Sequence, residues 1–130
     1  MRALAYLWAL PNTLLGAPLV LAALLSGGCV RLVEGVLEVH GRALAWLLRR
    51  AVPLAGGAQA MTLGHVVLGR DAAALDRCRV HEQAHVRQYE TWGPFFLPAY
   101  FAAGLLAYLR GGNPYWDNPF ERDARRAEKG

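Results

Sequence analysis

Charged side chains are scarce in this 130-residue chain, making up only 18% of it, whereas soluble domains commonly carry about 25%. Together with the 55% of hydrophobic residues, this shortage predicts that part of the surface faces lipid. Nucleic acid is not an expected partner, because the arginines behind the net charge of +4 are scattered rather than gathered with aromatics on one face. Anionic membrane lipid is the partner that we expect instead.

Cysteine is equally scarce, with only Cys29 and Cys78 in the chain. They form no CxxC pair, which argues against a thiolate metal site, and two cysteines do not make a disulfide-stapled scaffold. A single disulfide between them remains open at this point. The length leaves room for one domain and not comfortably for two.

No charged residue occurs between Ala3 and Leu25. Such a run is long enough to cross a hydrocarbon core of about 30 Å, which takes about 20 helical residues. We therefore predict a transmembrane helix, with residues 1–28 as an N-terminal membrane anchor in a bacterial cytoplasmic (inner) membrane. The alternative is a cleaved signal peptide that starts at Arg2 and ends near Cys29. Because the run exceeds the usual apolar region of about 7–15 residues, the retained anchor is favoured.

A small sheet is predicted after the anchor. Residues 30–40 hold two short β-branched runs around Gly35, a pattern typical of a hairpin. Residues 59–68 are again strand-like, and Gly64 within them suggests a β-bulge. These segments predict an antiparallel sheet of three strands.

Two helices are expected on either side of the second strand segment. Arg42 to Arg50 has helical apolar spacing, and Pro53 is expected to end that helix. Asp71 is a plausible N-cap for a second helix that reaches Glu90 and stops before Gly93. With the sheet, they predict a helix-dominated α+β fold over residues 29–130.

The second helix carries an HExxH motif, His81-Glu82-Gln83-Ala84-His85. The spacing of His81 and His85 puts both imidazoles on one helix face, where they can reach a single ion at about 2.0–2.1 Å. Glu82 lies about 100° around the helix, where it can take a proton from a zinc-bound water and pass it to the leaving amine. Zn²⁺ is the expected metal, since imidazole and carboxylate ligands suit it. The alternative is a solvated helix face with both histidines exposed.

A third ligand is needed, because two histidines hold zinc weakly. Asn118 as N-cap, Pro119 at the first helical position and Glu121 two residues later predict a helix start. We favour Glu121 as the ligand, although the same position also suits a capping box without any metal. Three other acidic residues are held in reserve as ligands: Glu90, Asp117 and Asp123.

Residues 92–109 form a second apolar stretch, rich in aromatics. A full membrane crossing there would leave His85 and Glu121 on opposite sides of the bilayer. We therefore predict a membrane-interface helical segment that folds back antiparallel to the HExxH helix.

Four other side chains are weighed for minor roles. His65 is interpreted as a strand surface residue, with an approach to substrate as the alternative. Tyr89 and Tyr115 are candidate oxyanion donors or interface anchors. Gln88 continues the histidine face and is a candidate hydrogen-bond partner behind the metal ligands.

The order of a strand, an HExxH helix, apolar helices and a Glu-x-x-Ala helix resembles the gluzincin core of integral-membrane zinc metallopeptidases. The similar families are the CAAX-prenyl-protease and heat-shock membrane protease type and the antirepressor sensor type. The resemblance covers residues 58–91 and 118–127 and depends mainly on the HExxH motif.

The resemblance implies a zincin-like fold and a peptide or protein substrate that pairs with an edge strand near Thr62–Leu68. It also implies a division of roles within the motif residues: zinc ligands His81, His85 and Glu121, and catalytic base Glu82. One departure is Arg125, which stands where those families usually place an aspartate that supports the first histidine.

The expected function is that of a membrane-attached zinc metalloendopeptidase. Two alternatives are kept. A non-catalytic metal-binding module would need a fourth protein ligand, because structural zinc sites are closed. A membrane scaffold with an accidental motif would bind no stoichiometric metal.

Overall fold

The computed structural model describes residues 2–51 and 57–129, and the helix end expected at Pro53 lies outside these ranges. In chain order the elements are α1 (Arg2–Leu25), β1 (Cys29–Val33), β2 (Val36–His40), α2 (Arg42–Arg50), β3 (Ala60–Leu63), β4 (Val66–Gly69), α3 (Ala72–Trp92), the 3₁₀ turn η1 (Gly93–Phe95), α4 (Phe96–Leu109) and α5 (Pro119–Lys129). The predicted α+β class and the helical N-terminus are therefore confirmed.

The sheet has four strands in the order β1-β2-β4-β3, with β2 and β4 parallel and the outer pairs antiparallel. The hairpin around Gly35 is confirmed, with φ of 79° at that glycine. The predicted three-stranded antiparallel sheet is wrong. Gly64 adopts φ of 61° in a turn that divides residues 59–68 into two strands, so no bulge forms. The long connection from β2 through α2 and β3 brings β4 beside β2 in parallel.

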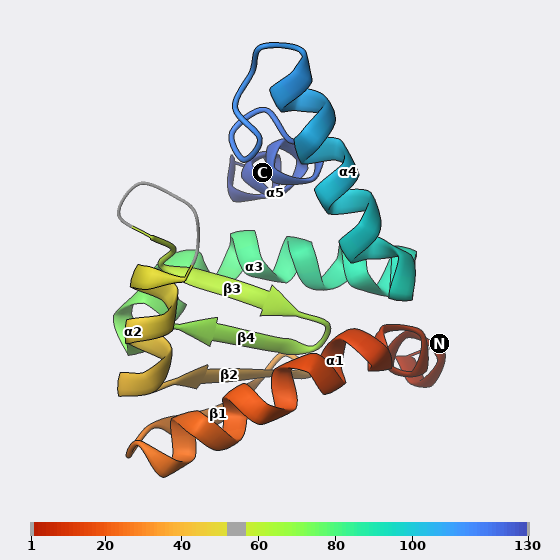
Figure 1. Cartoon of the computed structure of the whole chain (residues 1–130). Coiled ribbons are helices and arrows are strands. Elements are labelled where there is room, and N and C mark those ends of the chain that lie inside the picture. Colours follow the sequence, from red (N-terminus) through yellow and green to blue (C-terminus); the bar gives the residue numbers. More distant parts are fainter. Residues whose placement is uncertain (1, 52–56, 130) are drawn as a thin grey trace.

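Helices cover both faces of this sheet (Figure 1). On one face, Ala23 of α1 and Leu44 of α2 pack with Val39 and Leu68 of the central strands. On the other face, α3 packs Leu75 and Val86 onto the sheet. Since alternate strand residues point to opposite faces, β4 is apolar on both sides, whereas β2 places Glu38 beside Val36 on its α3 face. A partly buried ion pair also ties α3 to β2.

That ion pair joins Arg79 and Glu38, with the guanidinium donating to both carboxylate oxygens at 2.8 Å. Glu38 is only 2% exposed, so Arg79 supplies the partner that a buried carboxylate requires. Arg79 precedes the first histidine of the motif by two residues. The pair therefore fixes the motif helix against the sheet at the start of the candidate site.

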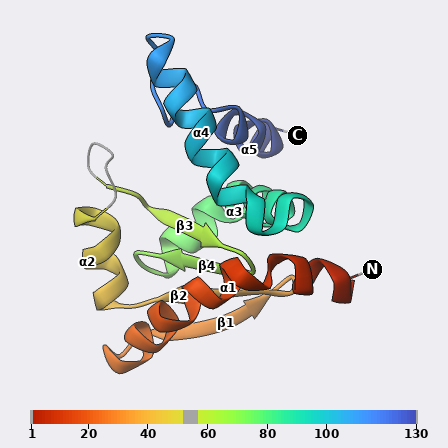
Figure 2. The same cartoon turned by 45° about the vertical axis from the view of Figure 1, so that its right-hand side comes forward.

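The chain beyond α3 does not follow the predicted hairpin. In both views α4 leaves the end of α3 at a steep angle, and α5 rather than α4 packs along α3 (Figures 1 and 2). The redirection occurs at Gly93, whose φ is 57° and which is followed directly by Pro94. A Cβ at Gly93 would lie 2.3 Å from the indole of Trp8, so the turn also requires glycine for space.

In the part of the chain that the structure describes, two helical stretches are long and apolar enough to cross a membrane by length and composition alone. They are Ala3–Leu25 and the continuous stretch Ala72–Leu109, to which α4 contributes its last part. A signal sequence or the core helix of a soluble protein passes the same test.

Candidate metal centre

Helix α3 presents the HExxH motif from its middle. The helix begins at the predicted N-cap, because the carboxylate of Asp71 accepts a hydrogen bond from Ala74 N at 2.7 Å. His81, Glu82 and His85 are all buried, with exposed fractions of 9%, 7% and 7%. The alternative of a solvated helix face therefore does not describe these residues.

Glu121 lies against both motif histidines. Its Oε1 is 3.0 Å from Nε2 of His81 and 3.1 Å from Nε2 of His85. One ligand atom from each of the three residues lies within 4.8 Å of the other two. Its second oxygen accepts a hydrogen bond from Tyr100 Oη at 2.5 Å. Glu121 therefore faces the histidines, as predicted, and its side chain is directed away from a capping role.

The predicted start of α5 explains how Glu121 reaches this position. Asn118 Oδ1 accepts a hydrogen bond from Phe120 N at 3.0 Å, and its amide donates to Tyr100 O at 3.0 Å. Asn118 is fully buried. Its side chain thus caps α5 and joins it to α4, which places the first turn of α5 over the histidines.

The far side of each imidazole is also held. Nδ1 of His85 donates to Gln88 Oε1 at 2.8 Å, and Nδ1 of His81 lies 3.1 Å from Glu128 Oε2. The Gln88 amide is oriented by its own donation to Phe120 O at 3.0 Å. With Nδ1 of His85 carrying a proton, its Nε2 is the nitrogen that is left to bind a metal ion. Such outer partners orient the histidines in metal sites.

Electrostatics in the cluster balance burial against ion pairing. Burial opposes the charged imidazole of His81, but the Glu121 carboxylate beside it prevails and raises the pKa of His81 to about 9. Burial opposes the charged carboxylate of Glu121 as well, yet the two imidazoles hold its pKa well below the usual range. A proton on the imidazoles therefore stabilises the same arrangement that a divalent cation would stabilise.

The side chain of Glu82 points toward the sheet and not toward His81, His85 and Glu121. Its Oε1 accepts a hydrogen bond from Thr62 Oγ1 on β3 at 2.8 Å. Burial raises the pKa of this carboxyl, while the neighbouring imidazoles and Thr62 act in the opposite direction. The side chain thus lies beside the His81–His85–Glu121 cluster without joining it, as its place on the helix predicted.

The donor set fits zinc. Two imidazole nitrogens and one carboxylate oxygen are among the ligands that zinc prefers, and three protein ligands are typical of catalytic zinc sites. In the described part of the chain no fourth His, Cys, Asp or Glu joins the group. The acidic residues held in reserve have other partners: Glu90 binds His65, Asp117 accepts from Asn113 N, and Asp123 lies 3.4 Å from Gln88 Nε2.

Two of the secondary interpretations change. His65 is only 4% exposed and pairs with Glu90 at 2.8 Å, so it is not the strand surface residue that we predicted. It lies in the turn between β3 and β4, where α1 and α3 cover it. The Tyr89 hydroxyl donates to Thr62 O at 2.9 Å, which commits it to the sheet. Tyr115 is half-buried near the cluster, and burial raises its pKa.

Three residues of the site were given no site role from the sequence. Glu128 is seven residues after Glu121, two helical turns along the same face, and this spacing could have revealed it. Thr62 faces α3 because side chains alternate along β3. Predicting its direction would have required the correct bounds of that strand. Tyr100 was interpreted only as an interface aromatic. Gln88 forms a hydrogen bond to His85, as its place on the histidine face predicted.

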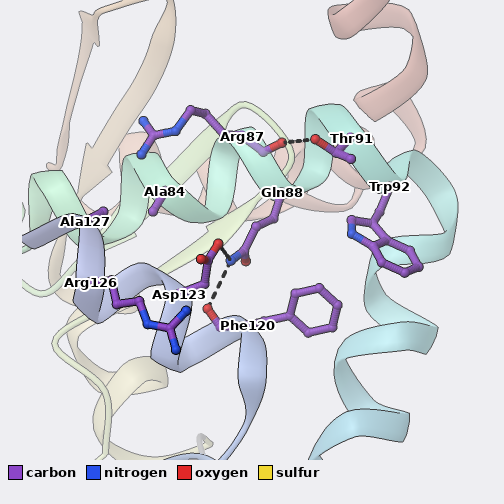
Figure 3. A pocket seen from close by; sticks show the side chains of 9 residues that line it. All are labelled: Ala84, Arg87, Gln88, Thr91, Trp92, Phe120, Asp123, Arg126 and Ala127. Carbon is purple, nitrogen blue, oxygen red and sulfur yellow. Dashed lines mark hydrogen bonds between the residues drawn. The ribbon is translucent and has the colours of Figure 1, made fainter.

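A cavity of about 480 Å³ opens between α3 and α5 behind the cluster (Figure 3). Gln88 reaches across it from α3 to Phe120 and Asp123 of α5, and Arg87 and Arg126 stand at its sides (Figure 3). None of His81, Glu82, His85 and Glu121 lines it. The cavity therefore borders the outer partners of the site and not the ligand atoms.

No protein-family model matches the chain, and neither the curated proteins nor the solved structures include a significant match to it.

Proposed function

We propose that this chain is a membrane-attached zinc metallopeptidase that hydrolyses peptide bonds on a minimal, gluzincin-like core. One observation carries the proposal. His81, His85 and Glu121 bring their ligand atoms within 4.8 Å of one another, and the buried carboxylate of Glu82 is adjacent. This combination supplies both a metal site and a base.

His81, His85 and Glu121 would hold the metal. Bound there, zinc supplies Lewis-acid chemistry, polarising a peptide carbonyl and making water more acidic. Gln88 and Glu128 keep the two imidazoles in the orientation in which both Nε2 atoms face Glu121. Tyr100 holds the remaining oxygen of Glu121, so the carboxylate presents one oxygen to the cluster.

Glu82 acts as the proton carrier. Thr62 anchors its Oε1 from β3, which fixes the carboxylate beside the cluster. A general base works best when its pKa lies near the operating pH, and burial shifts the pKa of Glu82 in that direction. The carboxylate takes a proton from the attacking water and later releases it to the amine that leaves.

The edge of the sheet next to Glu82 suits an extended peptide. On this side of the sheet β3 is the edge strand, and β4 is internal. Of the residues Thr62–Leu68 that we expected to pair with a peptide substrate, only those in β3 are therefore at an edge. Arg70 N donates to Gln59 O across the β3–β4 pair, so by alternation the backbone groups of Ala60 and Thr62 point away from β4. Tyr89 already occupies the carbonyl of Thr62. Among the described residues, the backbone of Ala60 and the N–H of Thr62 therefore face the outer side of the edge strand, where a peptide could pair, within two residues of the anchor of Glu82.

The packing of α1 supports its retention in the mature chain. Ala9, Asn12 and Ala23 are at most 3% exposed, and Ala23 lies in the same core cluster as Val39 and Leu68. Cleavage after a signal sequence would remove these residues and open the core. The remaining surface of α1 is apolar, which supports attachment to a membrane, with a bacterial cytoplasmic membrane as the proposed location.

The test is cleavage of quenched fluorescent peptides by detergent-purified protein. Glu82→Gln is expected to keep its zinc and to lose activity by about 10²–10⁴-fold, the usual contribution of a general base. Glu90→Gln is the matched control, because Glu90 lies on the same helix but binds His65 instead of facing the cluster. Unchanged cleavage by Glu82→Gln would contradict the assigned base.

A further inference from the structure

Helix α1 has an apolar face that no part of the described chain covers. Its exposed leucines include Leu4, Leu7, Leu14, Leu15, Leu21 and Leu25, each at least 55% exposed. Among the described side chains of the helix, the polar ones do not share this face. Asn12 and Thr13 both contact the folded domain, and Tyr6 donates to Gly35 O at 2.6 Å. Soluble proteins rarely expose a patch of this extent.

The other face of α1 is fixed to the domain along most of the helix. Near the start, Tyr6 bonds to the β1–β2 turn at Gly35. In the middle, Asn12 Nδ2 donates to Gly93 O at 2.8 Å. Near the end, Ala23 is buried in the core cluster with Val39 and Leu44. These contacts extend from residue 6 to residue 23, about 26 Å at 1.5 Å per residue. The helix cannot separate from the sheet without breaking them.

This attachment is incompatible with a helix that crosses the bilayer. A crossing α1 would carry the sheet beside it into the hydrocarbon. The edge strand β1 would then expose its backbone groups to lipid, which open sheet edges do not do. Arg31 on β1 is 63% exposed and Glu34 in the adjacent turn is exposed, and charges at that depth are costly.

The apolar face continues beyond α1. The rings of Trp8 and Phe95 lie 6.0 Å apart where α1 meets the junction of α3 and α4, and Trp8 Nε1 donates to Thr91 O at 3.2 Å. From there α4 exposes further apolar side chains, including Phe101 at 66% and Leu109 at 71%. The two helices thus present adjoining apolar surfaces.

The residues around this apolar face favour membrane lipid as its partner. Exposed arginines follow α1 at Arg42, Arg49 and Arg50, and Arg110 ends α4, as expected beside anionic headgroups. Trp46 is 62% exposed among them, and tryptophan prefers the membrane–water interface. Among the described residues, the exposed arc of α1 presents no hydrogen-bonding side chain, whereas protein–protein interfaces commonly form hydrogen bonds.

We propose that the chain is monotopic: α1 lies in the plane of a single leaflet, and both of its ends stay on the side of the membrane that holds the metal cluster. The inference rests on the membrane attachment within the proposed function and not on its zinc chemistry. An in-plane helix buries its apolar face in the headgroup–acyl boundary while its other face remains with the domain.

The direct test is cysteine labelling of the full-length protein in bacterial membranes. Cys29 is exposed just after α1, so a Cys78→Ala variant reports the C-terminal end of the helix. A second variant combines Ala3→Cys with Cys29→Ala and Cys78→Ala and reports the N-terminal end. An impermeant maleimide is applied to intact spheroplasts and to inside-out vesicles. We expect both positions to react in the same preparation, and reaction in opposite preparations would overturn the proposal.

A second measurement tests the proposal independently, in case the cysteine variants misfold. Purified protein is sedimented with vesicles of phosphatidylglycerol and phosphatidylcholine. Leu14→Glu and Leu21→Glu, both at exposed positions, are expected to weaken vesicle binding at least tenfold while zinc content is unchanged. Val80→Glu is the control, because Val80 is 53% exposed on α3, across the sheet from α1. Equal binding by all variants, or a soluble dimer in place of a vesicle-bound chain, would overturn the proposal while leaving the peptidase assignment intact.

Discussion

Gln88 accepts a hydrogen bond from Nδ1 of His85 at 2.8 Å and donates one to the backbone carbonyl of Phe120 at 3.0 Å. A single buried amide therefore sets the orientation of one imidazole and ties α3 to the helix that carries Glu121. Two of the three proposed ligands depend on it. The position of α5 and the direction of the His85 lone pair are thus coupled.

Gln88→Met tests this coupling, because methionine keeps the volume but loses both hydrogen bonds. We expect zinc affinity to fall about 10–100-fold, the usual effect of removing such a partner. Gln83→Met is the matched control, since Gln83 is on the same helix and its buried Nε2 has no hydrogen-bond partner among the described residues. Competition with a chromogenic chelator measures both, and equal affinities would show that Gln88 does not orient the ligand.

Glu128 is expected to act on His81 in the same way but more weakly. Its carboxylate lies 3.1 Å from His81 Nδ1, and its side chain is 45% exposed, so solvent screens the interaction. Glu128→Ala should lower zinc affinity by only a few fold and leave helix content unchanged. Lys129→Ala, one residue further along α5, serves as the control in the same titration. A loss as large as that of Glu121→Ala would mean that Glu128 is itself a ligand.

Metal binding should release a proton. In the metal-free protein the neighbouring carboxylate prevails over burial and raises the pKa of His81 to about 9, so the imidazole is protonated at pH 7.5. Zinc must displace that proton, and apparent affinity should therefore rise with pH up to about 9. Calorimetric titration in buffers of different ionisation enthalpy counts the protons released. A binding enthalpy that is the same in every buffer would show that no proton is released and would contradict the expectation.

The same ion pair makes a prediction for stability without metal. The pKa of His81 is raised relative to the unfolded chain, so its contribution is complete below about pH 6.5 and is lost as pH rises through about 9. The melting temperature of metal-free protein should therefore fall across that window. Glu121→Gln removes the partner and should flatten the dependence. An unchanged pH profile in this variant would assign the effect to another group.

The chemistry-bearing residues could be predicted from the sequence because their pattern is local. The HExxH spacing places His81 and His85 on one face whatever the rest of the fold, and the Asn-Pro start of α5 predicts where Glu121 lies along the chain. The hairpin at Gly35 is equally local. The convergence of Glu121 on the histidines required the tertiary structure, since Tyr100 and Asn118 position α5 through contacts with α4.

The sheet was predicted less well for a physical reason. A glycine inside a β-rich segment marks either a bulge or a turn, and Gly64 became a turn because Thr13 of α1 lies against it. A Cβ there would lie 2.3 Å from Thr13 Oγ1. The parallel pairing of β2 with β4 likewise depends on packing between distant segments. The steep exit of α4 follows from Gly93 against Trp8, another contact with α1 that the sequence does not reveal.

The most direct test of the account is the zinc content of detergent-purified protein, measured by mass spectrometry for the wild type and for single alanine variants. The account predicts one zinc per wild-type chain, and loss of that zinc in His85→Ala and in Glu121→Ala, with Glu90→Ala as a control that keeps it. A wild-type chain that folds without stoichiometric zinc, or a Glu121→Ala protein that binds zinc as tightly as the wild type, would contradict it.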